Sequence, residues 1–387
     1  MKKLFIVNNN LHLGGVQRAL VNLLWNIRGE YDVTLFLFYD GGILRNQLPP
    51  EVEILSAKSA YRWLGMNKFD AGKSITDWIM RGSFATITRI FGRKAAVALM
   101  KPTQPLLDGY DVAISYLHNS GDRSFYGGCN EFVLNHVNAK KKIAFVHGDF
   151  SSGTLGKKSA ADYELFHRIC ACSQGCAQSF LLRNPQLWNR VSVVKNCHRF
   201  QEIQRLAEQE EIALPKAPLN VLTVARLGPE KGILRALEAV ADLDLRFTVI
   251  GEGKERRTLE KFIEERKIGE KVSLLGELEN PYPWMKQADV LLIPSYHEAA
   301  PLVIGEAASL GTAILTTETC SAREMVEEKG FGWVCENSAE GIRKVLNDLL
   351  EHPEIIENQR QTLHAVSHSN QEALEQFAAV MEGENDG

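Results

Sequence analysis

Short apolar runs alternate with helical repeats along almost the whole chain, and this alternation most restricts the fold. Runs such as 4–7, 33–38 and 143–146 are rich in apolar residues and end at polar residues or glycine. Between the runs, apolar residues recur at close to helical spacing, as they do from Val16 to Ile27. Strands that alternate with helices form parallel βαβ units. The sequence therefore predicts an α/β protein built from doubly wound parallel sheets.

The chain of 387 residues is too long for one ordinary hydrophobic core, so two domains are expected. A charged run from Gln201 to Glu211, followed by Pro215 and Pro218, marks the junction. We expect an N-terminal domain at 1–197, a C-terminal domain at 198–365, and a helix and tail at 366–387 that can pack back on the first domain. Further strands are predicted at 111–115, 191–194, 219–225, 247–250, 272–275, 290–293, 313–316 and 332–334, and helices at 233–240, 258–266, 283–287, 339–350 and 371–381.

Composition and charge exclude several classes of protein. An apolar content of 45% and a charged content of 24% are typical of a globular protein in water. The net charge of −4 gives no whole-molecule attraction to nucleic acid. No apolar run reaches the ~18 residues that span a bilayer, and the run 1–7 stops at Asn8, as a first buried strand does. We expect a cytoplasmic protein that does not bind nucleic acid.

The seven cysteines do not form a disulfide framework, because they are odd in number and scattered. Cys170, Cys172 and Cys176 are the only cluster, and no second pair of ligands lies nearby in the sequence. The surrounding residues suggest a strand that runs into a helix. These thiols are therefore predicted to be packing residues rather than metal ligands.

The stretch 58–101 differs from the rest of the first half, because it has nine cations and only Asp70 and Asp77 as acids. Its apolar residues recur at close to helical spacing, and Arg81, Arg89, Arg93 and Lys94 are expected mainly on the remaining face. A basic amphipathic helix of this kind can lie in an anionic membrane surface. The alternative is a surface helix whose apolar stripe packs inward.

Two glutamates stand eight positions apart in the second half of the chain. Glu298 follows the predicted strand 290–293, and Glu306 falls in a short predicted helix that Pro301 can begin. Open α/β sheets bind ligands at the carboxyl ends of their strands, where both carboxylates are expected. The alternative is an ordinary strand-turn-helix with two solvated glutamates.

Two cations follow the first strand of the same half. Arg226 and Lys231 lie in ARLGPEKG, where a tight turn leads into a helix. Cations and a helix N-terminus suit a diphosphate, and carboxylates accept hydrogen bonds from sugar hydroxyls. A nucleotide-sugar is the simplest ligand that carries both groups.

With these motifs in hand, the chain resembles the retaining glycosyltransferases of GT-B family 4, most strongly across 219–334. The motifs that carry the resemblance are ARLGPEKG and SYHEAAPLVIGEAASLGTAILTT. It implies two Rossmann-like domains facing a central cleft, with Arg226 and Lys231 on the donor diphosphate. It also implies that Glu306 binds the nucleotide ribose and Glu298 the donor sugar. The phosphate and sugar would also meet the backbone of Pro301, Leu302 and Val303.

The first half matches the family less closely. Gly14 and Gly15 resemble its glycine pair near the diphosphate, where missing side chains permit close approach, although a plain tight turn is the alternative. His147 ends a strand, as does the family's histidine at the reaction centre, and is the candidate for positioning the donor sugar or the acceptor. Asp149 is a weaker companion.

Three features depart from the family or from other transferases. Ala299 and Ala300 stand where many relatives have glycine after the first glutamate, and 196–199 reads Asn-Cys-His-Arg instead of the usual interdomain turn. The sequence Asp242-Leu-Asp244 resembles the metal-binding motif of the other glycosyltransferase fold, but it precedes a strand and falls at the wrong end of the sheet. No metal and no cofactor are therefore expected.

The resemblance implies sugar transfer with retention from a nucleoside-diphosphate sugar, a UDP-sugar being favoured, to a glycan or lipid-linked acceptor. The expected setting is bacterial cell-surface or exopolysaccharide synthesis, at the inner face of the plasma membrane if 58–101 contacts lipid. The residues assigned to catalysis are His147, Arg226, Lys231 and Glu298. Two alternatives stay open: a sugar-nucleotide epimerase or other GT-B enzyme, and a non-catalytic binding subunit of a synthase complex.

Overall fold

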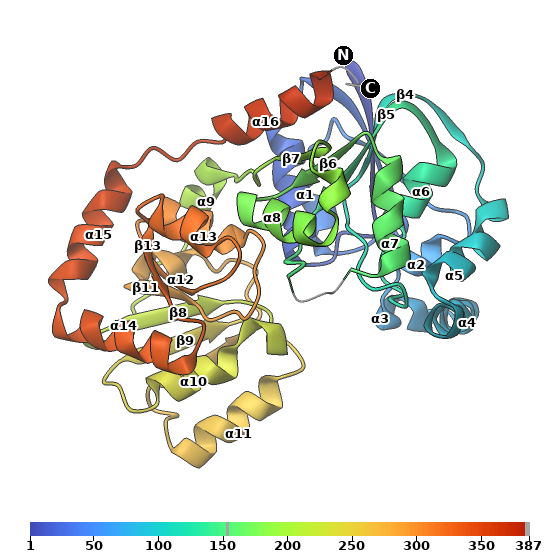
Figure 1. Cartoon of the computed structure of the whole chain (residues 1–387). Helices are drawn as coiled ribbons and strands as arrows, with labels where there is room; N and C mark the ends of the chain where they lie inside the picture. The colour runs from blue at the N-terminus through green and yellow to red at the C-terminus, as the bar shows by residue number, and fades with distance from the viewer. Residues whose placement is uncertain (152–154, 384–387) are drawn as a thin grey trace. The chain divides into compact units, whose positions relative to one another are not determined.

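The computed structural model describes residues 1–151 and 155–383, and the chain divides into two compact units (Figure 1). Unit 1 comprises Met1–Cys197 together with the residues from Asn370 onward, and unit 2 comprises His198–Ser369. Each unit is a parallel β-sheet with crossover helices, which confirms the predicted fold class. Both are Rossmann-like domains.

The sheet of unit 1 has the strand order β3-β2-β1-β4-β5-β6-β7. Because the order changes direction beside β1, the crossover helices fall on both faces of the sheet. The strands are β1 (Lys2–Asn8), β2 (Tyr31–Leu37), β3 (Glu53–Ser56), β4 (Leu107–Ser115), β5 (Val137–Val146), β6 (Arg168–Ala171) and β7 (Val191–Val193). The helices are α1 (Gly15–Asn26), α2 (Arg62–Gly65), α3 (Lys68–Gly72), α4 (Ile75–Phe91), α5 (Arg93–Met100), α6 (Cys129–His136), α7 (Lys157–Asp162), α8 (Gln174–Arg183) and α16 (Gln371–Glu382).

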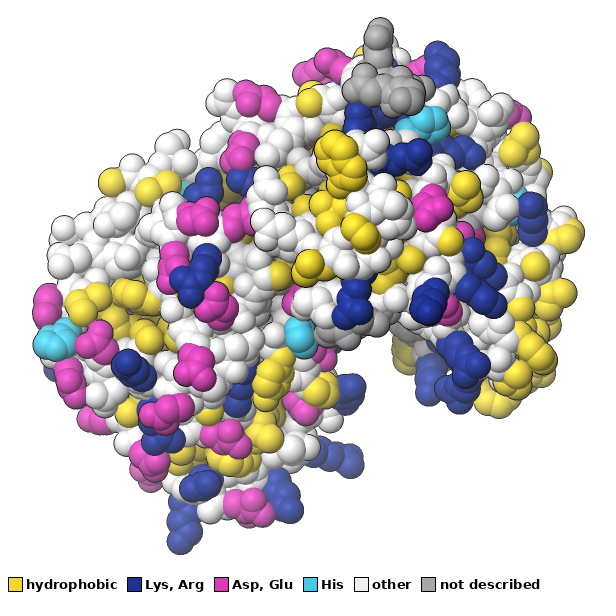
Figure 2. All heavy atoms as spheres, viewed as in Figure 1, with side chains coloured by type: hydrophobic (Ala, Val, Ile, Leu, Met, Phe, Trp, Pro, Cys, Tyr) yellow, Lys and Arg dark blue, Asp and Glu magenta, His cyan; other side chains and the backbone are white. Residues whose placement is uncertain are grey.

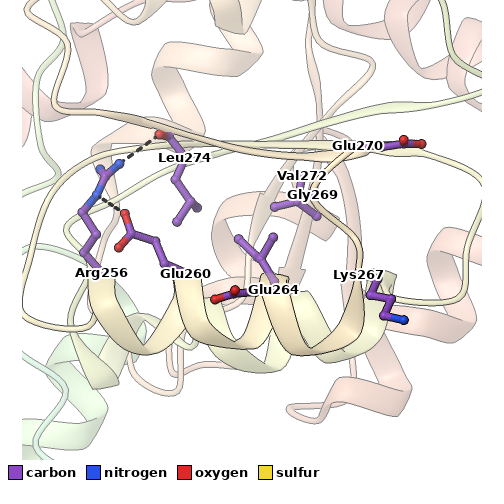
Figure 3. A pocket seen from close by; sticks show the side chains of 9 residues that line it. Arg256, Glu260, Glu264, Lys267, Gly269, Glu270, Val272 and Leu274 are labelled. Atoms are coloured by element: carbon purple, nitrogen blue, oxygen red, sulfur yellow. Dashed lines mark hydrogen bonds and ion pairs between the residues drawn. The ribbon is translucent and has the colours of Figure 1, made fainter.

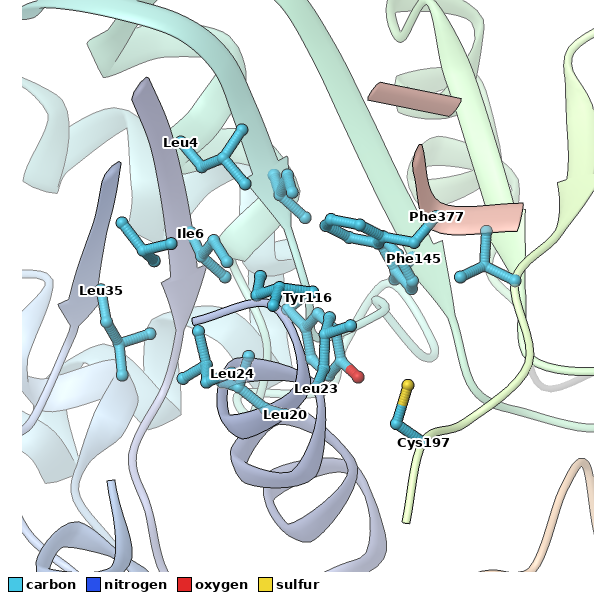
Figure 4. Close-up of a cluster of buried hydrophobic side chains, with 14 of the residues drawn as sticks. Leu4, Ile6, Leu20, Leu23, Leu24, Leu35, Tyr116, Phe145, Cys197 and Phe377 are labelled. Atoms are coloured by element: carbon cyan, nitrogen blue, oxygen red, sulfur yellow. The ribbon is translucent and has the colours of Figure 1, made fainter. Parts of the chain in front are cut away.

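The core of unit 1 includes side chains from both ends of the chain (Figure 4). Leu4 and Ile6 of β1 pack with Leu20 and Leu24 of α1, and the helical period of α1 places its leucines toward the sheet. Phe377 of α16 is fully buried in the same cluster. Helix α16 is therefore part of the unit 1 core, although unit 2 separates it from the rest of that unit in sequence.

Three asparagines leave β1 and are buried. Asn9 donates through Nδ2 to the carbonyl oxygens of Leu64 (3.2 Å) and Gly127 (3.3 Å), and Asn10 donates to the Gly65 oxygen (2.7 Å). A buried amide must be hydrogen-bonded, so this polar run holds the loop that leads to α1 rather than facing solvent.

The sheet of unit 2 has the strand order β10-β9-β8-β11-β12-β13. Its strands are β8 (Asn220–Val224), β9 (Arg246–Ile250), β10 (Val272–Gly276), β11 (Val290–Ile293), β12 (Ala313–Thr317) and β13 (Gly332–Cys335). Its α-helices are α9 (Phe200–Ala207), α10 (Ile233–Val240), α11 (Arg256–Arg266), α12 (Tyr282–Gln287), α13 (Leu302–Ser309), α14 (Ala339–Glu351) and α15 (Glu354–Ala365). Two apolar clusters contain side chains from this sheet, as a doubly wound fold requires.

The chain passes between the units twice, and in unit 1 both passages are attached to α1. Asn22 of α1 donates through Nδ2 to the Cys197 carbonyl oxygen at 3.0 Å. One turn further along α1, Asn26 accepts at Oδ1 from Nδ2 of Asn370 at 2.8 Å. Residues four apart share one face of a helix, so a single face of α1 holds both passages.

Both passages are also packed within unit 2. The ring of Phe200 lies 5.1 Å from the ring of His198 and 5.6 Å from the ring of His368. His198 immediately follows the first passage and His368 shortly precedes the second. The chain is therefore fixed on either side of each crossing.

The stretch 58–101 forms helices α2 to α5 rather than one continuous helix. The expected outward position of Arg93 is wrong, because its side chain is 1% exposed and donates to Glu131 Oε1 (2.8 Å) and Ser159 Oγ (2.7 Å). Lys94 pairs with Asp162 at 2.7 Å. These two cations hold α5 in place within unit 1. No helix in the described ranges is long and apolar enough to cross a membrane.

The cysteine cluster has the expected local structure. Cys170 is buried at the end of β6, and Cys172 and Cys176 are buried around the start of α8. The Cys176 thiol donates to the Gly148 oxygen at 3.2 Å. Burial raises the pKa of Cys170 well above its usual value, so its thiol stays protonated at neutral pH.

Candidate functional site

The change of direction in the unit 2 sheet brings two of the predicted motifs together. Strands β8 and β11 are neighbours, and the chain order reverses between them. Arg226 and Lys231 follow β8, and Glu298 follows β11. Doubly wound sheets bind ligands at this switch point, outside the carboxyl ends of the strands. The strand order therefore supports the predicted convergence of cations and carboxylate.

Lys231 and Glu298 form a direct ion pair. Lys231 Nζ lies 2.6 Å from Glu298 Oε1, and the Ser295 hydroxyl donates to the same oxygen at 2.7 Å. The two charged side chains are 24% and 12% exposed, which leaves them partly shielded but reachable from solvent. Both contacts fall on Oε1, so Oε2 keeps its capacity to accept a hydrogen bond.

Arg226 has a different environment. Its side chain is 74% exposed and pairs with Glu230 through Nη2 and Oε1 at 2.6 Å. An exposed ion pair of this kind contributes little to stability, so the guanidinium can leave Glu230 for an anion at small cost. The backbone of Glu230 also accepts from the Tyr296 amide at 2.9 Å, which ties the loop after β8 to the loop after β11.

The turn after Lys231 requires glycine. Gly232 has φ +64, and a Cβ there would lie 2.1 Å from the Pro294 oxygen at the end of β11. The same oxygen accepts from Nε of Arg235 at 2.8 Å. Arg235 is 5% exposed, and its guanidinium carbon lies 3.9 Å from the centre of the Tyr296 ring. Arg235 thus fixes the exit of β11, from which Glu298 extends.

Glu306 lies on the second turn of α13 and is buried, with 4% of its surface exposed. The Tyr282 hydroxyl donates to Glu306 Oε1 at 3.4 Å. Pro301 is the residue before the helix, and no side chain within 1–151 or 155–383 caps the first turn, which begins with Leu302 and Val303. Uncapped N–H groups at a helix N-terminus attract anions, as the predicted phosphate contact requires.

His198 is a residue of this site that the sequence did not reveal. Its Nε2 donates to the Leu302 carbonyl oxygen at 3.1 Å, and a Cβ on Gly305 would lie 2.6 Å from that nitrogen. Burial lowers the pKa of His198 to about 4, so the ring is neutral at pH 7. The histidine that replaces the family's usual interdomain residue therefore supports the first turn of α13.

In unit 1, Gly14 and Gly15 begin α1 just beyond the end of β1. Gly14 is extended, with φ −176, and no side chain caps the helix. A Cβ on Gly15 would meet nothing within 4 Å, so packing against described residues does not require glycine there. The open space fits the prediction that a ligand approaches the backbone at this position.

His147 follows β5 and lies beside a second histidine, His118, which follows β4. Burial first, and then the neighbouring His118, lower the pKa of His147 to about 3, and burial lowers the pKa of His118 to about 4. Nε2 of His147 and Nδ1 of His118 are buried without a hydrogen-bond partner in the described part of the chain. Buried polar atoms are normally satisfied, so these two nitrogens retain hydrogen-bonding capacity that the described residues do not use.

A separate groove lies between α11 and β10 in unit 2 (Figure 3). Arg256 lines it and bonds Glu260 Oε1 (2.8 Å) and the Leu274 oxygen (3.3 Å). None of the predicted site residues lines this groove. Asp242, of the rejected metal motif, pairs with Arg343 at 3.0 Å before β9 begins. Neither feature belongs to the switch-point site.

Comparisons with known proteins relate the chain to glycosyltransferases. Residues 204–364 match the family model "Glycosyl transferases group 1". The chain is 28% identical to the Campylobacter jejuni "GalNAc-alpha-(1->4)-GalNAc-alpha-(1->3)-diNAcBac-PP-undecaprenol alpha-1,4-N-acetyl-D-galactosaminyltransferase", covering 98% of this chain and 99% of that protein. A second enzyme of that organism, "N-acetylgalactosamine-N,N'-diacetylbacillosaminyl-diphospho-undecaprenol 4-alpha-N-acetylgalactosaminyltransferase", is 25% identical over 90% of this chain and 91% of its own.

Solved structures share the fold over the whole chain. Anabaena HepE in complex with UDP and glucose has a TM-score of 0.69 at 16% identity, covering 99% of this chain and 100% of its own. WaaG, a glycosyltransferase involved in lipopolysaccharide biosynthesis, has a TM-score of 0.60 at 17% identity, covering 98% and 100%. Residues 204–364 thus resemble the glycosyl transferases group 1, and the two Rossmann-like units of the chain have the GT-B fold.

Proposed function

We propose that this protein transfers a sugar, with retention of anomeric configuration, from a nucleoside-diphosphate sugar to a hydroxyl of a glycan or lipid-linked acceptor. The ion pair between Lys231 and Glu298 at the switch point carries the proposal. It places a cation for a phosphate beside a carboxylate for a sugar hydroxyl. A UDP-sugar is the favoured donor, and the UDP complexes of HepE support that choice.

Binding is assigned to two parts of unit 2. Lys231 and Arg226 hold the diphosphate, together with the uncapped first turn of α13. Glu306 accepts hydrogen bonds from the nucleotide ribose, and Glu298 binds the donor sugar. Glu306 is buried beside Tyr282, whose hydroxyl donates to its Oε1, and a carboxylate in this position can accept hydrogen bonds from ribose hydroxyls.

In the proposed reaction, the bond from the anomeric carbon to the diphosphate breaks as the bond to the acceptor oxygen forms. The departing phosphate oxygen takes the proton of the acceptor hydroxyl, so no enzyme nucleophile is needed. Negative charge that grows on the diphosphate is stabilised by Lys231, Arg226 and the N-terminus of α13. His147 positions the donor sugar or the acceptor from unit 1. Because Lys231 and Arg226 stabilise the negative charge on the diphosphate, turnover is expected to persist in the presence of a metal chelator.

The acceptor is assigned to bacterial cell-surface or exopolysaccharide synthesis at the inner face of the plasma membrane. Two of the relatives act on undecaprenol-linked glycans, according to their names, and a third is a glycosyltransferase of amylovoran biosynthesis from Erwinia amylovora. These likenesses support a lipid-linked acceptor for this chain.

A thermal-shift panel of UDP-, GDP- and ADP-sugars tests the donor site. We expect a UDP-sugar to raise the melting temperature of the wild type, and Glu306→Gln to lose that response while keeping its fold. Glu270→Gln, on the surface of the same unit, is the matched control and should respond as the wild type does. The assignment fails if no nucleotide stabilises the wild type, or if Glu306→Gln responds fully.

A product assay separates the two alternatives from transfer. Conversion of the nucleotide-sugar without any acceptor would indicate an epimerase. Binding without turnover, in the presence of lipid-linked acceptor extracts, would indicate a non-catalytic subunit. Sugar incorporated into the lipid-linked fraction supports the transferase.

A further inference from the structure

Helix α4 carries an apolar stripe that faces solvent. Ile75, Trp78, Ile79 and Ile90 are 80%, 65%, 51% and 56% exposed and recur at the spacing of one helical face. The opposite face holds the helix in unit 1, where Phe84 and Thr88 are buried. The sequence allowed either a membrane-surface helix or a helix whose apolar stripe packs inward. The exposure of these four side chains excludes inward packing of the whole stripe.

The neighbouring helices extend this apolar surface. Phe69 of α3 is 76% exposed, Phe91 at the end of α4 is 68% exposed, and Leu99 of α5 is 59% exposed. Figure 2 shows hydrophobic side chains gathered with Lys and Arg side chains on the part of unit 1 that α3 to α5 form. Large exposed apolar patches of this kind mark interaction surfaces.

The charge on this surface has one sign. Lys68, Lys73 and Arg89 are exposed there, and Lys68 and Arg89 have no carboxylate partner in the described part of the chain. The only acids between 68 and 99 are Asp70 and Asp77, which are 5% and 8% exposed. Asp70 bonds His12 at 2.6 Å, and Asp77 bonds Arg62 and Trp63. The two carboxylates are thus turned inward, whereas Lys68, Lys73 and Arg89 are turned outward.

We propose that the exposed face of α3 to α5, the α4 face, docks on an anionic lipid membrane. Apolar side chains flanked by cations match the layered chemistry of a membrane surface, where acyl chains lie beneath negatively charged headgroups. Trp78 suits the boundary between these layers. The inference rests on the proposed function, because a lipid-linked acceptor requires an enzyme held at the membrane. Beyond the proposed function, the inference identifies the α4 face as the surface that contacts the membrane.

Flotation of the full chain with vesicles tests the α4 face. The wild type should bind phosphatidylcholine vesicles that contain phosphatidylglycerol. Trp78→Ser combined with Ile79→Ser should weaken this binding by at least about tenfold, because both apolar side chains are lost. Lys68→Ala and Arg89→Ala should each weaken it by about fivefold, and only when phosphatidylglycerol is present.

A matched control uses apolar residues exposed elsewhere on unit 1. Leu182 and Trp188 are 77% and 73% exposed, and Leu182→Ser combined with Trp188→Ser should bind vesicles as the wild type does. The proposal is overturned if the wild type ignores anionic vesicles, or if both double variants lose binding equally. It is also overturned if the Trp78 variant instead abolishes a dimer seen by light scattering, because a second copy would then cover the face.

The same variants distinguish this proposal from the proposed function. Trp78→Ser combined with Ile79→Ser should keep the full thermal response to UDP-sugar, because neither residue belongs to unit 2. Loss of vesicle binding with an unchanged nucleotide response supports the docking surface. An absent nucleotide response in the wild type would defeat the donor assignment and leave the vesicle result standing.

Discussion

Lys231 and Glu298 neutralise each other, and under the proposed function that pairing sets what a ligand must supply. A diphosphate competes for the ammonium, while a sugar hydroxyl offers the carboxylate a donor. A ligand with only one of these groups would leave the other charge partly buried and unpaired, which is costly. The pair therefore favours ligands that carry both.

Lys231→Met should lower kcat for sugar transfer by about 10²–10³-fold, as the loss of one stabilising donor typically does. The apparent affinity for the UDP-sugar should also fall. Lys261→Met, at an exposed position on α11, is the matched control and should leave both quantities unchanged. Wild-type turnover by Lys231→Met would contradict the assigned role.

The pH dependence of stability follows from the buried histidines. His147 has a folded pKa of about 3, below the usual value of 6.5, so protons bind more strongly to the unfolded chain. The stabilisation that the neutral His147 ring adds to the free energy of unfolding is full above about pH 6.5 and is lost as the pH falls toward 3. At pH 5 the loss is about 2 kcal/mol for this one histidine. Urea unfolding of His147→Gln should show a correspondingly smaller fall in the free energy of unfolding between pH 7 and pH 5 than the wild type shows.

Sequence reasoning at the residue scale found the members of the unit 2 site through their motifs. It missed His118 and His198, because a lone histidine after a strand has no spacing to distinguish it. Only the strand order places His118 beside His147, and only the packing of Gly305 shows why His198 fits beneath α13. The assigned roles themselves stay predictions.

At the scale of elements, the strongest patterns gave the best boundaries. The predicted strand 290–293 and helix 233–240 coincide with β11 and α10, because each is a nearly uninterrupted apolar pattern. Strand β3 and helix α15 were missed: β3 is short and half-exposed, and α15 is mostly polar. For α4, the helical spacing of apolar residues predicted an apolar stripe. Spacing alone does not specify whether protein, lipid or solvent covers that stripe.

The turn between Lys231 and α10 can be tested with two glycines. Gly330→Ala places alanine at φ +67 with open space around its Cβ, and should cost about 1–2 kcal/mol. Gly232→Ala has nearly the same φ, but its Cβ would also clash with Pro294. We expect Gly232→Ala to lose more stability than Gly330→Ala. Only Gly232→Ala should also weaken the response to UDP-sugar. Equal effects of the two substitutions would show that the contact with Pro294 does not matter.

At the scale of the whole molecule, the order of residues along the chain does not match their order in space. Helix α16 follows unit 2 in sequence and completes the core of unit 1. The sequence predicts a helix at 371–381 that can pack back on the first domain, but the residues that its apolar face meets are set by contacts more than 300 residues apart. Such contacts leave no local pattern in a single sequence.

Phe377→Ala should therefore destabilise unit 1 rather than unit 2. Loss of a fully buried phenylalanine typically costs about 3–5 kcal/mol. Hydrogen exchange should accelerate in the amides of β1 and β4, while those of β8 and β11 stay protected. Leu363→Ala, which removes a buried side chain of α15, is the matched control and should reverse this pattern. Uniform acceleration in both units after Phe377→Ala would argue against independent cores.

The attachments at the two passages of the chain have a mechanical consequence. Asn22 and Asn26 hold the unit 1 side, and the rings around Phe200 hold the unit 2 side. Hardly any free chain is left between the held residues at 197–198 and at 368–370. A change in the path of either passage must therefore break one of these contacts or be absorbed by a few backbone torsions at 197–198 and 368–370.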